Sequence, residues 1–336
     1  MVTSLLVVVV ILALIFDYTN GFHDAANSIA TIVSTKVLTP FQAVLWAAVF
    51  NFVAYFVVKD HKVANYVSKI VDEHFVTMHV ILAGLIAAIT WNLTTWWFGI
   101  PSSSSHTLIG GFAGAGMANA LYMGSNALTA VNMHYIIPIV LCIFLAPFIG
   151  SLIGYIITII ILHICKNARP AAAERWFKVL QLISSALLSF AHGTNDAQKV
   201  MGILYLALIS SNIIGAGAAM PNWIPLACYS AIALGTMSGG WKIVKTMGTK
   251  ITKITPLEGV SAETGAAVTL LITEHFGIPV STTHTITGAI VGVGLTKRVS
   301  AVRWGVTINL VWAWIITIPI SALIAGLVFV LLRAIG

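Results

Sequence analysis

Apolar runs long enough to cross a membrane recur along the whole of this 336-residue chain. Hydrophobic residues make up 59% of the sequence, charged residues make up only 8%, and the mean hydropathy is +0.98. Soluble domains carry roughly 25% charged residues, and about 20 apolar residues in a helix span the hydrocarbon core of a bilayer. Because a chain in lipid must satisfy its own backbone hydrogen bonds, such runs form helices. The sequence therefore predicts an all-α polytopic membrane protein.

Basic residues give the chain a net charge of +7, most of it in short loops. In such loops they set the orientation in the membrane and do not indicate nucleic-acid binding. Cys142, Cys165 and Cys228 lack the paired spacing of a zinc site or a disulfide framework. The first 16 residues lack a basic start and a cleavage site, so we interpret them as a retained first helix. We expect no nucleic-acid partner and no cofactor.

The two halves of the chain carry the same polar motifs in the same order. Asn-Gly-Phe-His-Asp-Ala at 20–25 corresponds to His-Gly-Thr-Asn-Asp-Ala at 192–197, and Phe-Gly-Ile-Pro followed by Ser/Thr occurs at 98–107 and 276–285. Collinear matches at nearly one offset indicate an internal duplication of about 170 residues. We expect a first transmembrane repeat over 1–165, a basic cytoplasmic connector over 166–178 and a second transmembrane repeat over 179–336.

Duplicated membrane proteins usually fold as pseudo-symmetric transporters with interrupted helices near the bilayer midplane. Each half holds five hydrophobic segments, two of them interrupted or short, which gives about ten to twelve membrane segments. An odd number of crossings in each half inverts one repeat relative to the other. We therefore predict two inverted-topology repeats with broken or half helices. The first apolar run is expected to break at the polar cluster that begins with Asp17.

The Ser/Thr-rich motifs are candidate anion sites. Each begins with a proline, Pro101 or Pro279, which suits the first turn of a helix and places hydroxyls beside free backbone N–H groups. A helix start carries partial positive charge and binds anions. Two such starts indicate one oxyanion held between facing half-helices. The alternative is that these residues only cap two helices.

Asp24 and Asp196 occupy matched positions in the two halves. An ionisable side chain at membrane depth costs about 2.5 kcal/mol or more. Two acids beside two anion-attracting helix starts favour a cation or proton site, to which Asn27 and Asn195 add amide oxygens suited to sodium. The alternative is a buried ion pair or a helix cap. Lys199, three residues after Asp196, either neutralises this acid or contacts the substrate.

Glu263 lies in an apolar stretch, and the matched residue of the first half is Leu85, so this carboxylate breaks the symmetry. We favour a coupling role, and the alternative is a side chain that snorkels from the helix end toward water. His106 and His284 are matched within the Ser/Thr motifs, where we expect hydrogen bonds that fix the half-helices. No familiar metal-ligand spacing supports an intramembrane metal centre.

These motifs resemble the two signature regions of the inorganic phosphate transporter (PiT) family, which read much like residues 21–27 and 192–199. The Pro-x-Ser-[Ser/Thr]-[Ser/Thr]-His-Thr element of both halves is also typical of it. The resemblance covers essentially the whole chain and implies a low-affinity phosphate permease of the bacterial type. Such a protein is not an enzyme but an inner-membrane secondary transporter, which moves phosphate by symport with sodium or protons. The short central connector departs from relatives that carry a large hydrophilic loop.

The resemblance also implies roles for single residues. Glu263 lies where the family has an intramembrane glutamate important for transport, and we expect it to act in coupling together with Asp24 and Asp196. A sodium ion is expected at Asp24, Asn27, Asp196 and Asn195. The residues expected at the phosphate are Ser103, Ser104, Thr107, Ser281, Thr282, Thr285, Asn27 and Asn195.

Sulfate or another oxyanion is the main alternative substrate, because sulfate permeases belong to the same family. An intramembrane enzyme or receptor predicts one asymmetric constellation, whereas these motifs are paired. A passive channel has no need of buried carboxylates. The expected partners are phosphate, sodium or protons, and the lipid bilayer. A homodimer is compatible with the sequence, which does not fix the oligomeric state.

Overall fold

The computed structural model describes residues 2–215 and 217–335. Within these ranges the chain is helical, and its β pairing is a single isolated bridge between Val71 and Val131. Helices long and apolar enough to cross a membrane are α1 (Val2–Ser34), α2 (Pro40–Val57), α4 (Met78–Phe98), α6 (Met133–Ile164) and α12 (Trp304–Ile335). The remaining helices are α3 (Lys62–Val67), α5 (Ser104–Tyr122), α7 (Pro170–Ser210), α8 (Trp223–Ser238), α9 (Trp241–Lys245), α10 (Pro256–His275) and α11 (Thr282–Leu295). Short turns of helix are η1 (Glu73–Phe75), η2 (Ala127–Ala130), η3 (Thr246–Lys250) and η4 (Val299–Ala301).

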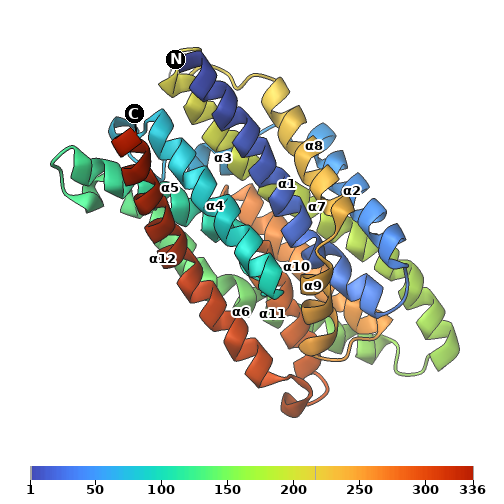
Figure 1. Ribbon diagram of the computed structural model, residues 1–336. Helices are drawn as coiled ribbons and strands as arrows, with labels where there is room; N and C mark the ends of the chain where they lie inside the picture. Colours follow the sequence, from blue (N-terminus) through green and yellow to red (C-terminus); the bar gives the residue numbers. More distant parts are fainter. Residues whose placement is uncertain (1, 216, 336) are drawn as a thin grey trace.

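The matched helices α1 and α7 run in opposite directions. Val9, near the start of α1, shares a hydrophobic cluster with Leu204, near the end of α7. Ile29, near the end of α1, shares a second cluster with Leu188, near the start of α7. The two repeats are therefore inverted, as the sequence predicts. Figure 1 shows an elongated helical bundle with both chain termini at one end.

The repeats also interlock. A Cβ atom on Gly114 of α5 would lie 2.3 Å from the backbone oxygen of Ala322 in α12, and one on Gly292 of α11 would lie 2.0 Å from that of Ser151 in α6. Small residues of this kind allow helices in membranes to pack closely. Each half-helix therefore packs against the last helix of the opposite repeat. The expected connector 166–178 is partly loop and partly the start of α7, which begins at Pro170.

A buried polar layer separates the two hydrophobic clusters. In α1, buried residues up to Phe16 belong to the first cluster, and those from Ala26 onward belong to the second. In α7 the order is reversed: buried residues up to Ala191 belong to the second cluster, and those from Ala197 onward belong to the first. α5 packs in the first cluster and α11 in the second. Both half-helices therefore begin at the polar layer and leave it toward opposite ends of the bundle. The layer contains Asp17, Asn20, His23, Asp24, His192, Asn195 and Asp196.

The structure corrects two local predictions. α1 continues without interruption through Asp17, so the expected break is wrong, and α7 likewise continues through the matched motif. A continuous helix satisfies the backbone within each segment, and the polar side chains find partners on other helices. The prolines do not open the half-helices either. α5 begins at Ser104 and α11 at Thr282, because Pro101 and Pro279 lie in the turn of a hairpin.

A lysine from the opposite repeat holds the tip of each hairpin. α4 and α5 form a hairpin that turns at Gly99, and α10 and α11 form one that turns at Gly277; both glycines have positive φ. Lys242 of α9 donates a hydrogen bond to the carbonyl of Trp97 at 3.0 Å, and Lys62 of α3 donates one to the carbonyl of His275 at 3.1 Å. Carbonyls at a helix C-terminus lack helical partners and favour a cation. Matched contacts thus hold both hairpins.

Candidate functional site

The first turns of α5 and α11 have the same local structure. Ser103 and Ser281 are the N-caps, and each hydroxyl accepts a hydrogen bond from the backbone N–H three residues later, at 3.2 Å. The hydroxyls of Thr107 and Thr285 donate to the carbonyls of these two serines, at 2.8 and 2.9 Å. Capping, the alternative interpretation of the motifs, is therefore present in both. The other N–H groups of each first turn have no acceptor within the helix.

Each aspartate of the duplicated motif accepts a hydrogen bond from the first residue of a half-helix. Ser104 donates to Oδ1 of Asp24 at 3.1 Å, and Thr282 donates to Oδ2 of Asp196 at 3.4 Å. All four side chains are buried. Atom Nδ1 of His23 donates to Oδ1 of Asp24 at 2.8 Å. The sequence predicts one aspartate in each repeat, and the structure shows that each faces the half-helix of its own repeat.

Lys199 links both hairpins to Asp196. Its side chain is only 1% exposed, and its ammonium donates to Oδ1 of Asp196 at 2.5 Å. It also donates to the hydroxyl of Ser105 in the first hairpin and, at 3.0 Å, to the carbonyl of Val280 in the second. Of the two roles left open by the sequence, neutralisation of Asp196 is the one the contacts show. The same ammonium lies where both hairpin turns meet.

Two asparagines of the motifs differ in their contacts. The amide nitrogen of Asn27 donates to the hydroxyls of Thr282 and Thr283, both at 3.0 Å. The amide of Asn195 and atom Oδ2 of Asp24 are buried without a hydrogen-bond partner among the described residues. Buried polar atoms are almost always paired, because an unpaired one costs free energy. Unpaired atoms at this position are typical of a binding site.

Atoms of Asp24, His192 and Asp196 that could bind a metal ion all lie within 4.8 Å of one another. Atom Nε2 of His192 lies 3.3 Å from Oδ2 of Asp196. Two of the four expected sodium ligands, Asp24 and Asp196, are thus brought together from opposite repeats. His192 was not among the expected ligands, and the residue matched to it in the first repeat is Asn20.

Glu263 has three hydrogen-bond donors and no access to solvent. Its carboxylate accepts from Thr31 at 2.6 Å, from Gln181 at 2.9 Å and from Ser184 at 2.5 Å. The snorkelling alternative is therefore wrong. The donors come from α1 and α7, the two helices that also carry the aspartate motifs. These donors lie far from Glu263 along the chain, so no local sequence pattern indicates them.

Aromatic stacking brings the two half-helix starts together. The rings of His106 and His284 lie 4.8 Å apart, and His284 stacks on Trp314 of α12 at 4.1 Å. The ring nitrogens of His106 have no hydrogen-bond partner among the described residues. The prediction of hydrogen bonds from His106 is therefore wrong, and ring packing fixes the start of α5. The indole of Trp314 also donates to the carbonyl of Pro101 at 3.0 Å.

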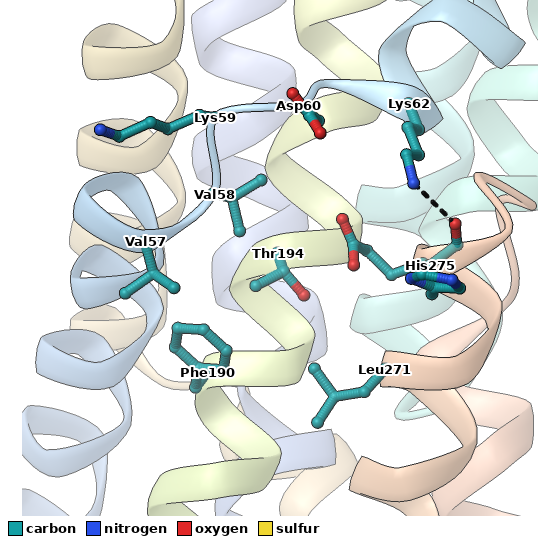
Figure 2. Close-up of a pocket in the computed structure, with 10 residues that line it drawn as sticks. Val57, Val58, Lys59, Asp60, Lys62, Phe190, Thr194, Leu271 and His275 are labelled. Carbon is teal, nitrogen blue, oxygen red and sulfur yellow. Dashed lines mark hydrogen bonds between the residues drawn. The ribbon is translucent and has the colours of Figure 1, made fainter.

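A pocket of about 400 Å³ lies next to the central motif of α7. Figure 2 shows Thr194 near its centre, between Phe190 and the loop with Asp60. Thr194 directly precedes Asn195 in α7, so the pocket borders the helix segment that carries the polar layer. The dashed contact in Figure 2 is the one that Lys62 makes with the tip of the second hairpin.

Comparison with known proteins assigns the chain to a family. The sequence profile of the "Phosphate transporter family" matches residues 20–325. The chain belongs to the phosphate transporter family. Its members transport and do not catalyse, so this protein is a transporter and not an enzyme. Its apolar helices and its bacterial relatives identify it as an integral protein of the inner membrane.

Relatives of this family member match over nearly the whole chain. A "Probable low-affinity inorganic phosphate transporter" of Rhizobium meliloti (strain 1021) is 49% identical over 97% of this chain and 96% of its own length. One of Bacillus subtilis (strain 168) is 45% identical over 98% of both. A solved structure, "The sodium-dependent phosphate transporter", matches with a TM-score of 0.87 and 26% identity, over 99% of this chain and 100% of its own.

Proposed function

We propose that this family member imports inorganic phosphate by secondary active symport with sodium ions or protons. The observation that carries the proposal is the meeting of two matched helix starts, those of α5 and α11, in one buried polar layer. Helix starts attract anions, and two that approach from opposite sides suit a tetrahedral oxyanion. The relatives named as phosphate transporters support phosphate as that anion.

The hydroxyls of Ser104 and Thr282 are the proposed direct donors. They now donate to Asp24 and Asp196, and a small rotation exchanges a carboxylate oxygen for a phosphate oxygen. The backbone N–H groups of both first turns and the amides of Asn27 and Asn195 complete the site. The remaining proposed contacts, which also shape the two turns, are Ser103, Thr107, Ser281 and Thr285.

Charge balance favours symport over a passive channel. The carboxylates of Asp24 and Asp196 and the ammonium of Lys199 lie at the two half-helix starts, so this part of the layer already carries an excess negative charge when its histidines are neutral. Adding phosphate increases that excess, and uncompensated charge at membrane depth costs several kcal/mol. A cation that enters with the anion removes the cost. We place it at Asp24 and Asp196, with the amide oxygens of Asn27 and Asn195 as further ligands.

Uptake into proteoliposomes tests this function and its specificity. With radiolabelled phosphate, accumulation should follow an imposed sodium or pH gradient, each varied separately. Arsenate should compete well and sulfate poorly, because the unpaired Oδ2 of Asp24 can accept only from an anion that keeps a hydroxyl. A site built around a substrate hydroxyl rejects an analogue without it by up to about 10⁴-fold. Uptake that only equilibrates would contradict symport, and sulfate competing as well as arsenate would favour the sulfate alternative.

Glu263→Gln should separate phosphate binding from coupling. The change keeps the shape of the side chain but removes the charge that Thr31, Gln181 and Ser184 stabilise. If Glu263 belongs to the coupling site, phosphate exchange persists, whereas gradient-driven accumulation falls by about tenfold or more. The matched control is Glu258→Gln on the same helix, where the carboxylate caps the helix start and pairs with Lys297. Equal accumulation in the two variants would make Glu263 structural.

A further inference from the structure

Asp17 is a buried carboxyl group that the site described above does not use. It lies on α1, two turns before Asp24, and is fully buried. Neither of its oxygens accepts a hydrogen bond from an N–H or O–H group of the described residues. An ionised carboxylate without donors is strongly disfavoured in such surroundings, whereas the neutral acid is tolerated. The geometry therefore requires something that removes this charge.

The surroundings of Asp17 suit a proton better than a metal ion. The group beside the carboxyl is the thiol of Cys228 in α8, which is a weak donor and a poor ligand for sodium. Tyr229 of α8 is also close enough to interact with the charge of Asp17. From α7, Asp196 and Lys199 act on Asp17 with opposite signs. Charged groups of α7 therefore act on Asp17 as well as the neighbours from α8.

The side-chain oxygen of Asn20 is a hydrogen-bond acceptor without a donor, and a protonated Asp17 would provide an O–H group nearby. Asn20 lies three residues later, on the same face of α1, and its side-chain oxygen is buried without a donor. The hydroxyl of Tyr229 is also buried without a partner. A protonated carboxyl has one O–H to donate and one oxygen left to accept. Protonation therefore turns unpaired polar atoms into a set that can hydrogen-bond internally.

We propose that Asp17 is a proton-binding site whose occupancy controls phosphate binding. The inference rests on the proposed transport function. When Asp17 loses its proton to water, a second carboxylate acts on Lys199, the ammonium that joins the two hairpins. The added negative charge weakens the attraction for an incoming anion. By linkage, phosphate binding in turn favours the protonated form of Asp17.

The pocket of Figure 2 carries a carboxylate that acts on Tyr229. Glu274 of α10 lines that pocket. Tyr229 lies close enough to interact with the charges of both Glu274 and Asp17. Charge at the pocket therefore acts on the same tyrosine as charge on Asp17.

The test compares phosphate affinity and pH in the wild type and Asp17→Asn, reconstituted in proteoliposomes. In the wild type, the apparent phosphate affinity should fall by about tenfold as the pH is raised and Asp17 loses its proton, as expected for one added charge near the site. Asp17→Asn, which mimics the protonated acid, should keep the high affinity and lose most of the pH response. The protonation of phosphate itself is common to both proteins and cancels. Asp72→Asn, which changes an exposed loop carboxylate, should respond as the wild type does.

A second variant shifts the titration instead of removing it. Cys228→Ser places a stronger donor beside Asp17 and stabilises the ionised form, so the fall in affinity should begin at lower pH. Identical pH profiles for the wild type and Asp17→Asn, or no shift in Cys228→Ser, would overturn the proton site. Phosphate exchange without an imposed gradient is measured for each protein. A wild type that exchanges no phosphate would refute the transport function itself, which distinguishes the two failures.

Discussion

Replacing Lys199 with methionine is expected to lower the free energy of unfolding by about 3–5 kcal/mol and to abolish phosphate uptake. The ammonium donates to Asp196, Ser105 and the carbonyl of Val280, and its side chain is buried. Removing it leaves the carboxylate of Asp196 without its cation in a low-dielectric layer. Denaturant-induced unfolding of the purified protein in detergent measures the loss of stability.

The double variant Asp196→Asn/Lys199→Met separates stability from transport. With neither charge present, the desolvation cost disappears, so most of the lost stability should return. Uptake should remain absent, because the double variant lacks both the ammonium that joins the two hairpins and one of the two carboxylates proposed to bind the coupling cation. Lys178→Met is the control: Lys178 pairs with Glu174 at the surface, and its loss should cost less than about 1 kcal/mol. A single variant as stable as this control would show that the Asp196 pair contributes little.

Local sequence patterns predicted the framework well. The duplicated motifs predict two inverted repeats, and the described helices confirm them. The spacing of Asp196 and Lys199 predicts a shared helix face, and the ion pair confirms it. Such inferences succeed because a duplication and an i,i+3 spacing are both written in the order of residues along one segment.

Contacts between distant segments could not be predicted in the same way. Nothing near Glu263 in the sequence indicates Thr31, Gln181 and Ser184, which come from two other helices. The polar cluster at Asp17 suggested a broken helix, because its partners across the bundle are invisible in the sequence. The burial of Asp17 beside Cys228 is likewise a product of packing between α1 and α8.

The hydroxyls at the two helix starts should have the largest effect on affinity. Ser104→Ala and Thr282→Ala each remove one donor to a charged group, worth about 1.5–3 kcal/mol, so phosphate affinity should fall about tenfold or more in each. Because both donors act on the same anion, their losses need not add, and the double variant should bind phosphate more weakly than either single variant. Ser230→Ala is the control, since that hydroxyl bonds only to its own helix at the exposed surface.

Calorimetric titration of the purified protein with phosphate, in the presence of sodium, measures the phosphate affinity of each variant most directly. Binding about tenfold weaker in each single variant, weaker still in the double variant and unchanged in Ser230→Ala would show that the anion is held between the two half-helices. Phosphate affinity that stays at the wild-type value in both Ser104→Ala and Thr282→Ala would contradict that arrangement.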